Sequence, residues 1–266
     1  MSKIYDALQI AYGEKLAAQK EPKTGIETSI GNEPIEVPSV SIPSSPLLKI
    51  QSSSSIPRYY KESELMVMAQ NIAALLPSPD KNVIQFIGSR KGEGTSTLVR
   101  EFALVSAQHS KKPVLLVEAD LAQPSQYQAF GIEVKSPLDH VLNDGKALEA
   151  VVSQVEQSNL FLATLSSKVQ SALTTRTFFN PTDMWKIVRE QFSLILIDSS
   201  PIGVTADSLV LCETVDGIVL VLEAEKTRSA VVKKVRDQIL MQEGNLLGIV
   251  VTKRKLYIPE IFYKLI

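Results

Sequence analysis

The sequence is poor in several features that mark particular classes of protein. It holds one cysteine among 266 residues, which rules out an internal disulfide framework and favours a reducing compartment. No apolar run approaches the roughly 20 residues that a membrane-spanning helix needs, and the N-terminus lacks the apolar core of a signal peptide. The net charge of −1 gives no reason to expect a nucleic-acid partner. We therefore expect a cytoplasmic protein that does not bind nucleic acid.

Metal-binding and thiol chemistry also find little support in the sequence. The two histidines, His109 and His140, are far apart and have no cysteine or acidic residue at metal-ligand spacing. His109 is expected to cap a helix end at the surface. Cys212 follows an apolar stretch, which favours a small buried side chain over a reactive nucleophile.

Three parts of the chain differ in composition. Residues 1–19 predict a short helix, because apolar residues recur near a 3.6-residue period. Residues 20–57 are rich in proline and serine and predict a disordered linker. On such a tether the helix is expected to dock on a partner, or alternatively to fold back on the core. Residues 58–266 form the third part.

This third part alternates predicted strands and helices. Apolar runs predict strands at residues 83–87, 114–117, 160–165, 194–197, 218–222 and 247–251. Helices are predicted at residues 62–76, 96–108, 146–157, 181–191, 206–213 and 227–242. Unbroken apolar strands between helices indicate an α/β fold with a mainly parallel sheet covered on both faces. Ligands of such sheets bind at the carboxyl ends of the strands, which directs attention to the first strand-to-helix turn.

That turn has most of the properties of a P-loop. A P-loop needs glycines for close approach of its amides to phosphate, a following helix N-terminus, a lysine for the β- and γ-phosphates, and a hydroxyl for Mg²⁺. Gly92, Gly94 and Ser96 are in register with this pattern, but Thr95 stands at the lysine position. The residues predicted to contact a nucleotide are Ser89, Arg90, Lys91, Gly92, Glu93, Gly94, Thr95, Ser96 and Thr97.

Three segments in order resemble the bacterial tyrosine kinases of capsule and exopolysaccharide systems, within the wider partition, septum-positioning and arsenical-pump ATPase superfamily. The resemblance covers residues 82 to about 255. The P-loop segment is GSRKGEGTSTLVREFA, with Thr95 in the lysine position. The family's Asp-x-Asp-x-Arg motif resembles VLLVEADLAQP, where Glu118 replaces the first Asp, Asp120 matches the second and Ala122 replaces the Arg. The Walker B strand resembles LILIDSSPIGVTAD, with Asp198 as the acid, and the chain's first and last segments, MSKIYDAL and YIPEIFYKLI, resemble members from exopolysaccharide loci.

The resemblance implies ATP and Mg²⁺ as cofactors. Its metal ligands map onto Ser96, Asp120 and Asp198, and Glu118 is the candidate general base. The other interpretation of Asp120 and Asp198 is helix capping or loop solvation at strand ends. Without the lysine, weak nucleotide binding and little turnover are expected. Lys91 is the candidate replacement cation in catalysis, with Arg90 beside it; alternatively both are exposed charges on a loop.

The family's tyrosine-rich tail and oligomerising helix are poorly matched. Only Tyr257 and Tyr263 lie near the C-terminus, in an apolar segment that favours packing or partner contact, and Tyr59 and Tyr60 are further candidates without a motif. The pattern Glu-x-x-Arg-x-x-Arg is half kept, because Glu64 is followed by Val67 and Gln70.

Two hypotheses follow from these matches and departures. The first is a regulatory or scaffolding pseudokinase docked on a membrane polysaccharide co-polymerase or export protein. It would be cytoplasmic or peripheral at the inner membrane through that partner, with homodimerisation left open. The second is an active autokinase or ATPase that uses Lys91 or a partner's cation.

Overall fold

The computed structural model describes residues 58–78, 80–166, 181–204 and 207–254. All of them belong to the second of two compact units of the chain, Val40–Ile266. The predicted N-terminal helix, the predicted linker, and Tyr257 and Tyr263 lie outside the described residues. Within the described ranges, no helix has the length and apolar character needed to cross a membrane.

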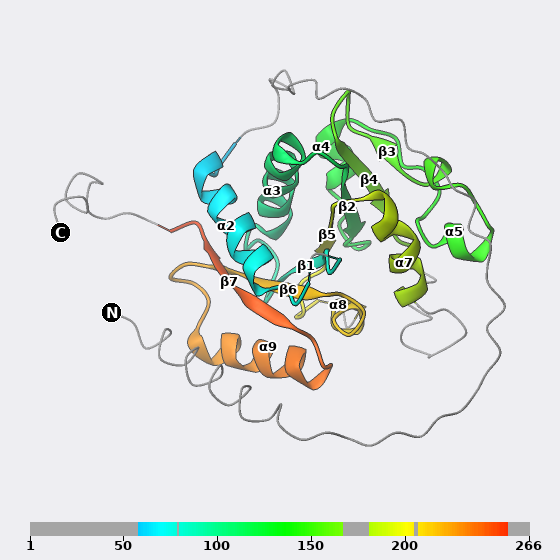
Figure 1. Ribbon diagram of the computed structural model, residues 1–266. Coiled ribbons are helices and arrows are strands. Elements are labelled where there is room, and N and C mark those ends of the chain that lie inside the picture. Colours follow the sequence, from blue (N-terminus) through cyan, green and yellow to red (C-terminus); the bar gives the residue numbers. More distant parts are fainter. Residues whose placement is uncertain (1–57, 79, 167–180, 205–206, 255–266) are drawn as a thin grey trace, which may run out of the picture. The chain divides into compact units, whose positions relative to one another are not determined.

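A seven-stranded sheet forms the centre of this unit (Figure 1). Its strands are β1 (Val83–Gly88), β2 (Val114–Ala119), β3 (Ser153–Gln154), β4 (Leu160–Thr164), β5 (Leu194–Ser199), β6 (Gly217–Glu223) and β7 (Leu246–Thr252). Their order is β3-β4-β2-β5-β1-β6-β7, and every neighbouring pair is parallel except β3 with β4. The predicted mainly parallel sheet is thus confirmed.

Helices cover both faces of the sheet and bury two separate apolar cores. The helices are α2 (Glu62–Leu75), α3 (Thr95–His109), α4 (Gln126–Phe130), α5 (His140–Asn143), α7 (Pro181–Gln191), α8 (Asp207–Leu211) and α9 (Ser229–Met241). One core contains Phe86 of β1 and Phe102 of α3, and the other contains Trp185 of α7 and Ile197 of β5. Because both faces are covered, the strands can be apolar throughout, as the sequence has them.

The helix predicted at residues 146–157 is wrong. The chain instead forms one 3₁₀ turn, Leu148–Ala150, followed by β3, which pairs antiparallel with β4. Val151, Val152 and Val155 are buried at spacings that imitate one face of a helix. β-Branched residues also suit strands, and pairing with the edge of β4 decided between the two structures.

Other predicted helices occur with shifted ends. The one predicted at 206–213 ends earlier, at Leu211 of α8, and α4 and α5 were not predicted. Cys212 is 1% exposed, as predicted for a small core residue. His109, the last residue of α3, lies at the surface, where its Nε2 is 2.8 Å from Oε1 of Glu62.

Candidate functional site

The sheet order brings the carboxyl ends of β1, β2 and β5 together. β5 lies between β1 and β2, and Glu118 at the end of β2 is directly opposite Asp198 of β5 in the register. Gly88 ends β1 only two residues after Phe86, which is the register partner of Asp198 on the other side. The predicted loop and two of the predicted acids therefore share one edge of the sheet.

The loop between β1 and α3 is a compact turn that depends on its glycines. Gly92 has φ +87° and Gly94, the N-cap residue of α3, has φ +89°, both in the left-handed region that disfavours a Cβ. A Cβ on Gly88 would lie 2.9 Å from Oγ1 of Thr95. These three glycines allow the backbone to turn tightly from the strand into the helix.

Thr95 fills the position of the missing lysine with a neutral side chain. It is the first residue of α3, and its hydroxyl approaches Gly88 from inside the turn. Lys91 is exposed and has no hydrogen-bond or ion-pair partner among the described residues. Arg90 is also exposed, and its guanidinium faces Thr227 at 3.4 Å and Oε1 of Glu93 at 3.8 Å.

Glu93 is buried inside the loop, with 1% of its surface exposed. Its Oε2 accepts hydrogen bonds from the backbone amides of Ser89 (2.6 Å) and Arg90 (3.0 Å). Its Oε1 accepts hydrogen bonds from the hydroxyls of Ser89 (2.8 Å) and Thr227 (2.7 Å). Four donors on two oxygens is the pattern that an ionised carboxylate accepts. The loop thus contains an anion of its own.

Sequence reasoning placed Glu93 among the loop residues but missed this internal role. The available signal was an acidic side chain between two glycines of a turn whose amides are expected to face an anion. Its partner Thr227 lies 134 residues further along the chain, so no local pattern could have identified it.

Residues at the end of β7 donate hydrogen bonds to backbone carbonyls of the loop. The hydroxyl of Thr252 donates to the carbonyl of Glu93, and the ammonium of Lys253 donates to the carbonyl of Gly92. The same ammonium lies 3.7 Å from Oε1 of Glu223. These contacts fix the backbone of the loop without placing a cation at the Thr95 position.

The two acids at the strand ends, Glu118 and Asp198, are buried. Burial, and then the charge of Asp198, raises the pKa of Glu118 to about 7, although the amides of Gln126 and Ser125 oppose the shift. Those amides donate to Oε2 of Glu118 at 2.6 and 2.7 Å. Burial likewise raises the pKa of Asp198 to about 6, against hydrogen bonds from Gln126 and Ser96.

Gln126, which the sequence did not single out, connects these groups. It is fully buried, and its Nε2 donates to Oδ2 of Asp198 (2.6 Å) and to the carbonyl of Ser96 (3.0 Å). Its Oε1 accepts a hydrogen bond from Nε of Arg100 at 2.8 Å. One amide side chain therefore joins the loop helix, α4 and the acid of β5.

Asp120 comes directly after β2, outside the group of residues that Gln126 joins. It is half-buried, and its Oδ1 accepts hydrogen bonds from the hydroxyl of Ser200 (2.8 Å) and the amide of Gln123 (3.1 Å). Its charge contributes to the raised pKa of both Glu118 and Asp198, so the three carboxyls are electrostatically coupled.

The residues fit the two implied ligands unequally. Oε1 of Glu118 and Oδ1 of Asp198 are buried and accept no hydrogen bond from the described residues, which suits a cation near Ser96. Among the described residues, no three His, Cys, Asp or Glu side chains form a metal group, so a hydroxyl ligand would be needed. The phosphate position fits poorly, because the loop lacks its lysine.

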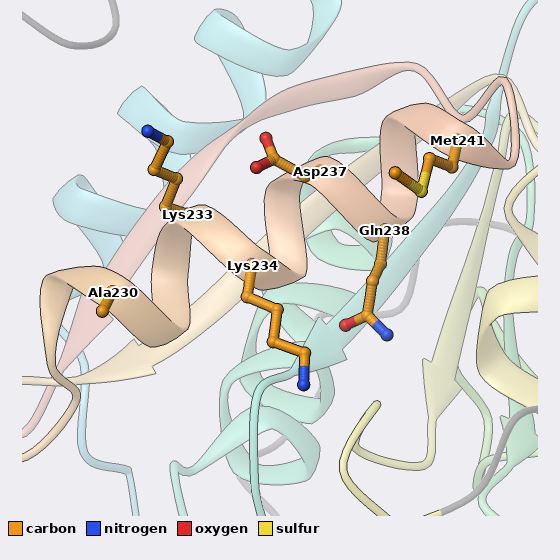
Figure 2. Close-up of a pocket in the computed structure, with 6 residues that line it drawn as sticks. All are labelled: Ala230, Lys233, Lys234, Asp237, Gln238 and Met241. Atoms are coloured by element: carbon orange, nitrogen blue, oxygen red, sulfur yellow. The ribbon is translucent and has the colours of Figure 1, made fainter.

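A separate hollow of about 440 Å³ lies along α9 (Figure 2). Its described lining comes from one helix: Ala230, Lys233, Lys234, Asp237, Gln238 and Met241. None of the residues predicted to bind a ligand lines it. Thr227, in the loop just before α9, nevertheless donates a hydrogen bond to Glu93, so the helix starts two residues after a residue that contacts the site.

Comparison with known proteins places the chain among bacterial kinases. No protein-family model matches the sequence. The tyrosine-protein kinase YwqD of Bacillus subtilis is 30% identical over 176 residues, which cover 62% of this chain and 69% of that protein. The kinase domain of VpsO is 28% identical, with a TM-score of 0.60, 73% of this chain covered and 96% of that one. The kinase domain of Escherichia coli tyrosine kinase ETK, at 16% identity, shares the fold, with a TM-score of 0.62 and coverage of 74% and 79%.

Proposed function

The chain belongs to the bacterial tyrosine kinase family, and we propose that it is a kinase-like component of a bacterial exopolysaccharide biosynthesis or export system with a degenerate nucleotide site. Its role in that system is regulatory or scaffolding. The observation that carries this proposal is Thr95, a buried neutral side chain at the lysine position of the glycine-rich loop.

The missing lysine bears on both binding and chemistry. A hydrogen bond to a charged group contributes about 1.5–3 kcal/mol. Loss of one electrostatic stabiliser of a transition state typically lowers the rate by about 10²–10³. Phosphoryl transfer relies almost wholly on positioning and charge, so both losses apply to it. ATP and Mg²⁺ would then bind weakly, and ATP would be turned over slowly.

The cations near the loop are poor replacements in the isolated chain. Lys253 and Arg90 are directed at loop groups, the first at the carbonyl of Gly92 and the second toward Glu93. Lys91 is exposed on the loop. To reach a phosphate, its long and solvent-exposed side chain would have to adopt one fixed conformation, which costs conformational entropy.

One observation favours the alternative of an active autokinase or ATPase. Glu118 and Asp198 are adjacent and buried, and each keeps one oxygen that accepts no hydrogen bond from a described residue. Burying two carboxyls in this state costs stability, which is easier to understand if a bound cation offsets it. In this alternative Lys91, or a cation from a partner, replaces the lysine.

Nucleotide binding separates the two functions. The proposal expects calorimetry with ATP and Mg²⁺ to show weak binding for the wild type, about tenfold or more tighter binding for Thr95→Lys, and no change for Lys91→Ala. Submicromolar ATP binding by the wild type, weakened by Lys91→Ala, would support the active enzyme instead. Asp198→Asn serves as the control that removes an acid while keeping its shape.

Labelled ATP tests turnover directly. The chain is incubated with Mg²⁺, alone and with membranes that contain its co-polymerase partner. If the role is regulatory, we expect no sustained labelled phosphate on the chain under either condition. Labelled phosphate on Tyr59, Tyr60, Tyr257 or Tyr263 would contradict the proposal.

The proposed partner is a membrane polysaccharide co-polymerase or export protein, contacted on its cytoplasmic face. The chain would then be cytoplasmic, or peripheral at the inner membrane through that partner. Co-purification of the full chain with the membrane fraction, and its release when the co-polymerase gene is deleted, would support this location. Homodimerisation is measured by light scattering of the purified chain.

A further inference from the structure

Gln126 contacts both acids of the site, one through its backbone and the other through its side chain. Its backbone amide donates to Oε2 of Glu118 at 2.6 Å, and its Nε2 donates to Oδ2 of Asp198 at 2.6 Å. Gln126 is 0% exposed, so both hydrogen bonds are made away from solvent. One residue therefore fixes one oxygen of each carboxylate.

The other oxygen of each acid is left without a hydrogen bond. Oε1 of Glu118 and Oδ1 of Asp198 are buried and accept none from the described residues. The two residues are register partners on adjacent parallel strands, so their side chains leave the sheet on the same face. Buried carboxylate oxygens without a donor are rare in packed interiors, and carboxylate oxygens are the ligands that a divalent cation of the Mg²⁺ type prefers.

The orientation of the Gln126 amide is set by a third residue. Its Oε1 accepts a hydrogen bond from Nε of Arg100 at 2.8 Å, and its Nε2 also donates to the carbonyl of Ser96 at 3.0 Å. A guanidinium can only donate, and a carboxylate can only accept. If the amide turned over, its NH₂ group would face the donor of Arg100 and its oxygen would face the carboxylate of Asp198. Arg100 thus keeps the donating end of Gln126 toward the acid.

We infer that Gln126 is a positioning residue, which holds Glu118 and Asp198 so that their free oxygens bind a divalent cation. This inference rests on the proposed function, to which it adds a cation site that persists without the lysine. Groups that hydrogen-bond to metal ligands orient those ligands, and their loss typically lowers metal affinity about 10–100-fold. The side-chain amide of Gln126 orients Asp198 in this way and adds no charge of its own.

Two substitutions at this position test the side chain alone. Gln126→Leu has a similar volume and keeps the backbone amide, but it has no donor for Asp198. Gln126→Asn keeps a buried amide, and its side chain is one methylene shorter, so it no longer reaches the acid. Gln128→Leu is the control, because it makes the same chemical change at an exposed residue of α4.

Mn²⁺ is the probe, because it takes the same oxygen ligands as Mg²⁺ and its paramagnetic resonance signal reports binding directly. The full chain is titrated with Mn²⁺ in the absence of nucleotide. The wild type should bind Mn²⁺ with saturation, and Mg²⁺ should displace it. Affinity should fall about tenfold or more in both Gln126→Leu and Gln126→Asn, and should stay at the wild-type level in Gln128→Leu. Thermal midpoints show which variants are folded, and Gln126→Asn decides the test if Gln126→Leu is not.

Three outcomes would overturn the inference. The first is a wild type that does not bind Mn²⁺. The second is wild-type affinity in the folded variants of Gln126, whose thermal midpoints alone fall, because the amide would then only stabilise the fold. The third is an equal loss of affinity in Gln128→Leu. None of these outcomes touches the proposed function, because no nucleotide is present, and that function fails only if the wild type binds and turns over ATP.

Discussion

Cys212 shows how burial sets the chemistry of a single residue. The thiol is 1% exposed in the core beneath α8, and its Sγ donates to the carbonyl of Ser208 at 3.3 Å. Burial raises its pKa to about 12 from the ordinary value of 9.0. The thiol is thus kept neutral and unreactive, which agrees with its prediction as a packing residue.

The same shift predicts a loss of stability at alkaline pH. A thiol whose pKa is raised on folding contributes stability that is fully present below pH 9 and is lost as the pH rises toward about 12. Between pH 7.5 and 10 the wild type should lose on the order of 1 kcal/mol through this group, and Cys212→Ala should lack that loss. Urea titrations at both pH values measure it, and parallel losses in the two proteins would contradict it.

At the level of elements, two buried acids hold segments that are distant in sequence. Asp216, just before β6, accepts both hydrogen bonds of Arg189 from α7, at 2.8 and 2.7 Å, and one from the amide of Val83 at 2.9 Å. Glu101 of α3 accepts the amides of Tyr59 and Tyr60 at 2.8–3.0 Å, just before α2 begins. Neither role follows from local sequence.

Removing Asp216 should destabilise the sheet at its amino edge. Asp216→Ala leaves the mostly buried guanidinium of Arg189 without its partner, and breaking such a pair costs about 3 kcal/mol. The exposed pair of Lys186 and Asp183, at 2.8 Å, is the control, since Lys186→Ala should cost less than about 1 kcal/mol. Denaturant unfolding compares them, and equal costs would count against the argument.

Weakening Glu101 should free the segment before α2. Glu101→Gln is a poorer acceptor for the two amides, so the chain around Arg58 and Lys61 should open more often. Trypsin should then cleave after these residues several times faster than in the wild type, with Glu190→Gln as the control. Unchanged cleavage would mean that packing of Tyr60, rather than Glu101, holds the segment.

At the level of the whole described unit, one sheet separates two cores. Helices α2 and α3 cover one face, and α7, α8 and α9 pack against the other (Figure 1). The chain's single tryptophan, Trp185, is fully buried in the second core. Because the strands contribute side chains to both cores, the two should unfold together.

A substitution in one core should therefore lower the unfolding midpoint that is measured by a probe in the other core. Phe102→Ala should cost about 3–5 kcal/mol in the core that lacks tryptophan. It should lower the midpoints measured by Trp185 fluorescence and by far-ultraviolet circular dichroism to the same extent. A fluorescence midpoint that stays in place while the dichroism midpoint falls would show that the two cores unfold independently.

The sequence by itself determined the fold class and the place of the site. Apolar runs of strand length interleaved with helices demand a parallel sheet, and the spacing of Gly92 and Gly94 after the first strand marks the turn. Thr95 and the acids Glu118 and Asp198 were visible for the same reason, because a motif fixes each position locally. Burial of Cys212 followed from its apolar neighbours.

Tertiary structure alone decided which partners these residues have. The turn that holds Glu93 needs Thr227, and Asp198 meets Gln126, which lies 72 residues earlier in the chain. The segment 146–157 became a 3₁₀ turn and a strand because the edge of β4 was there to pair with it. Contacts between distant segments depend on how the chain closes in space, and no local periodicity records that.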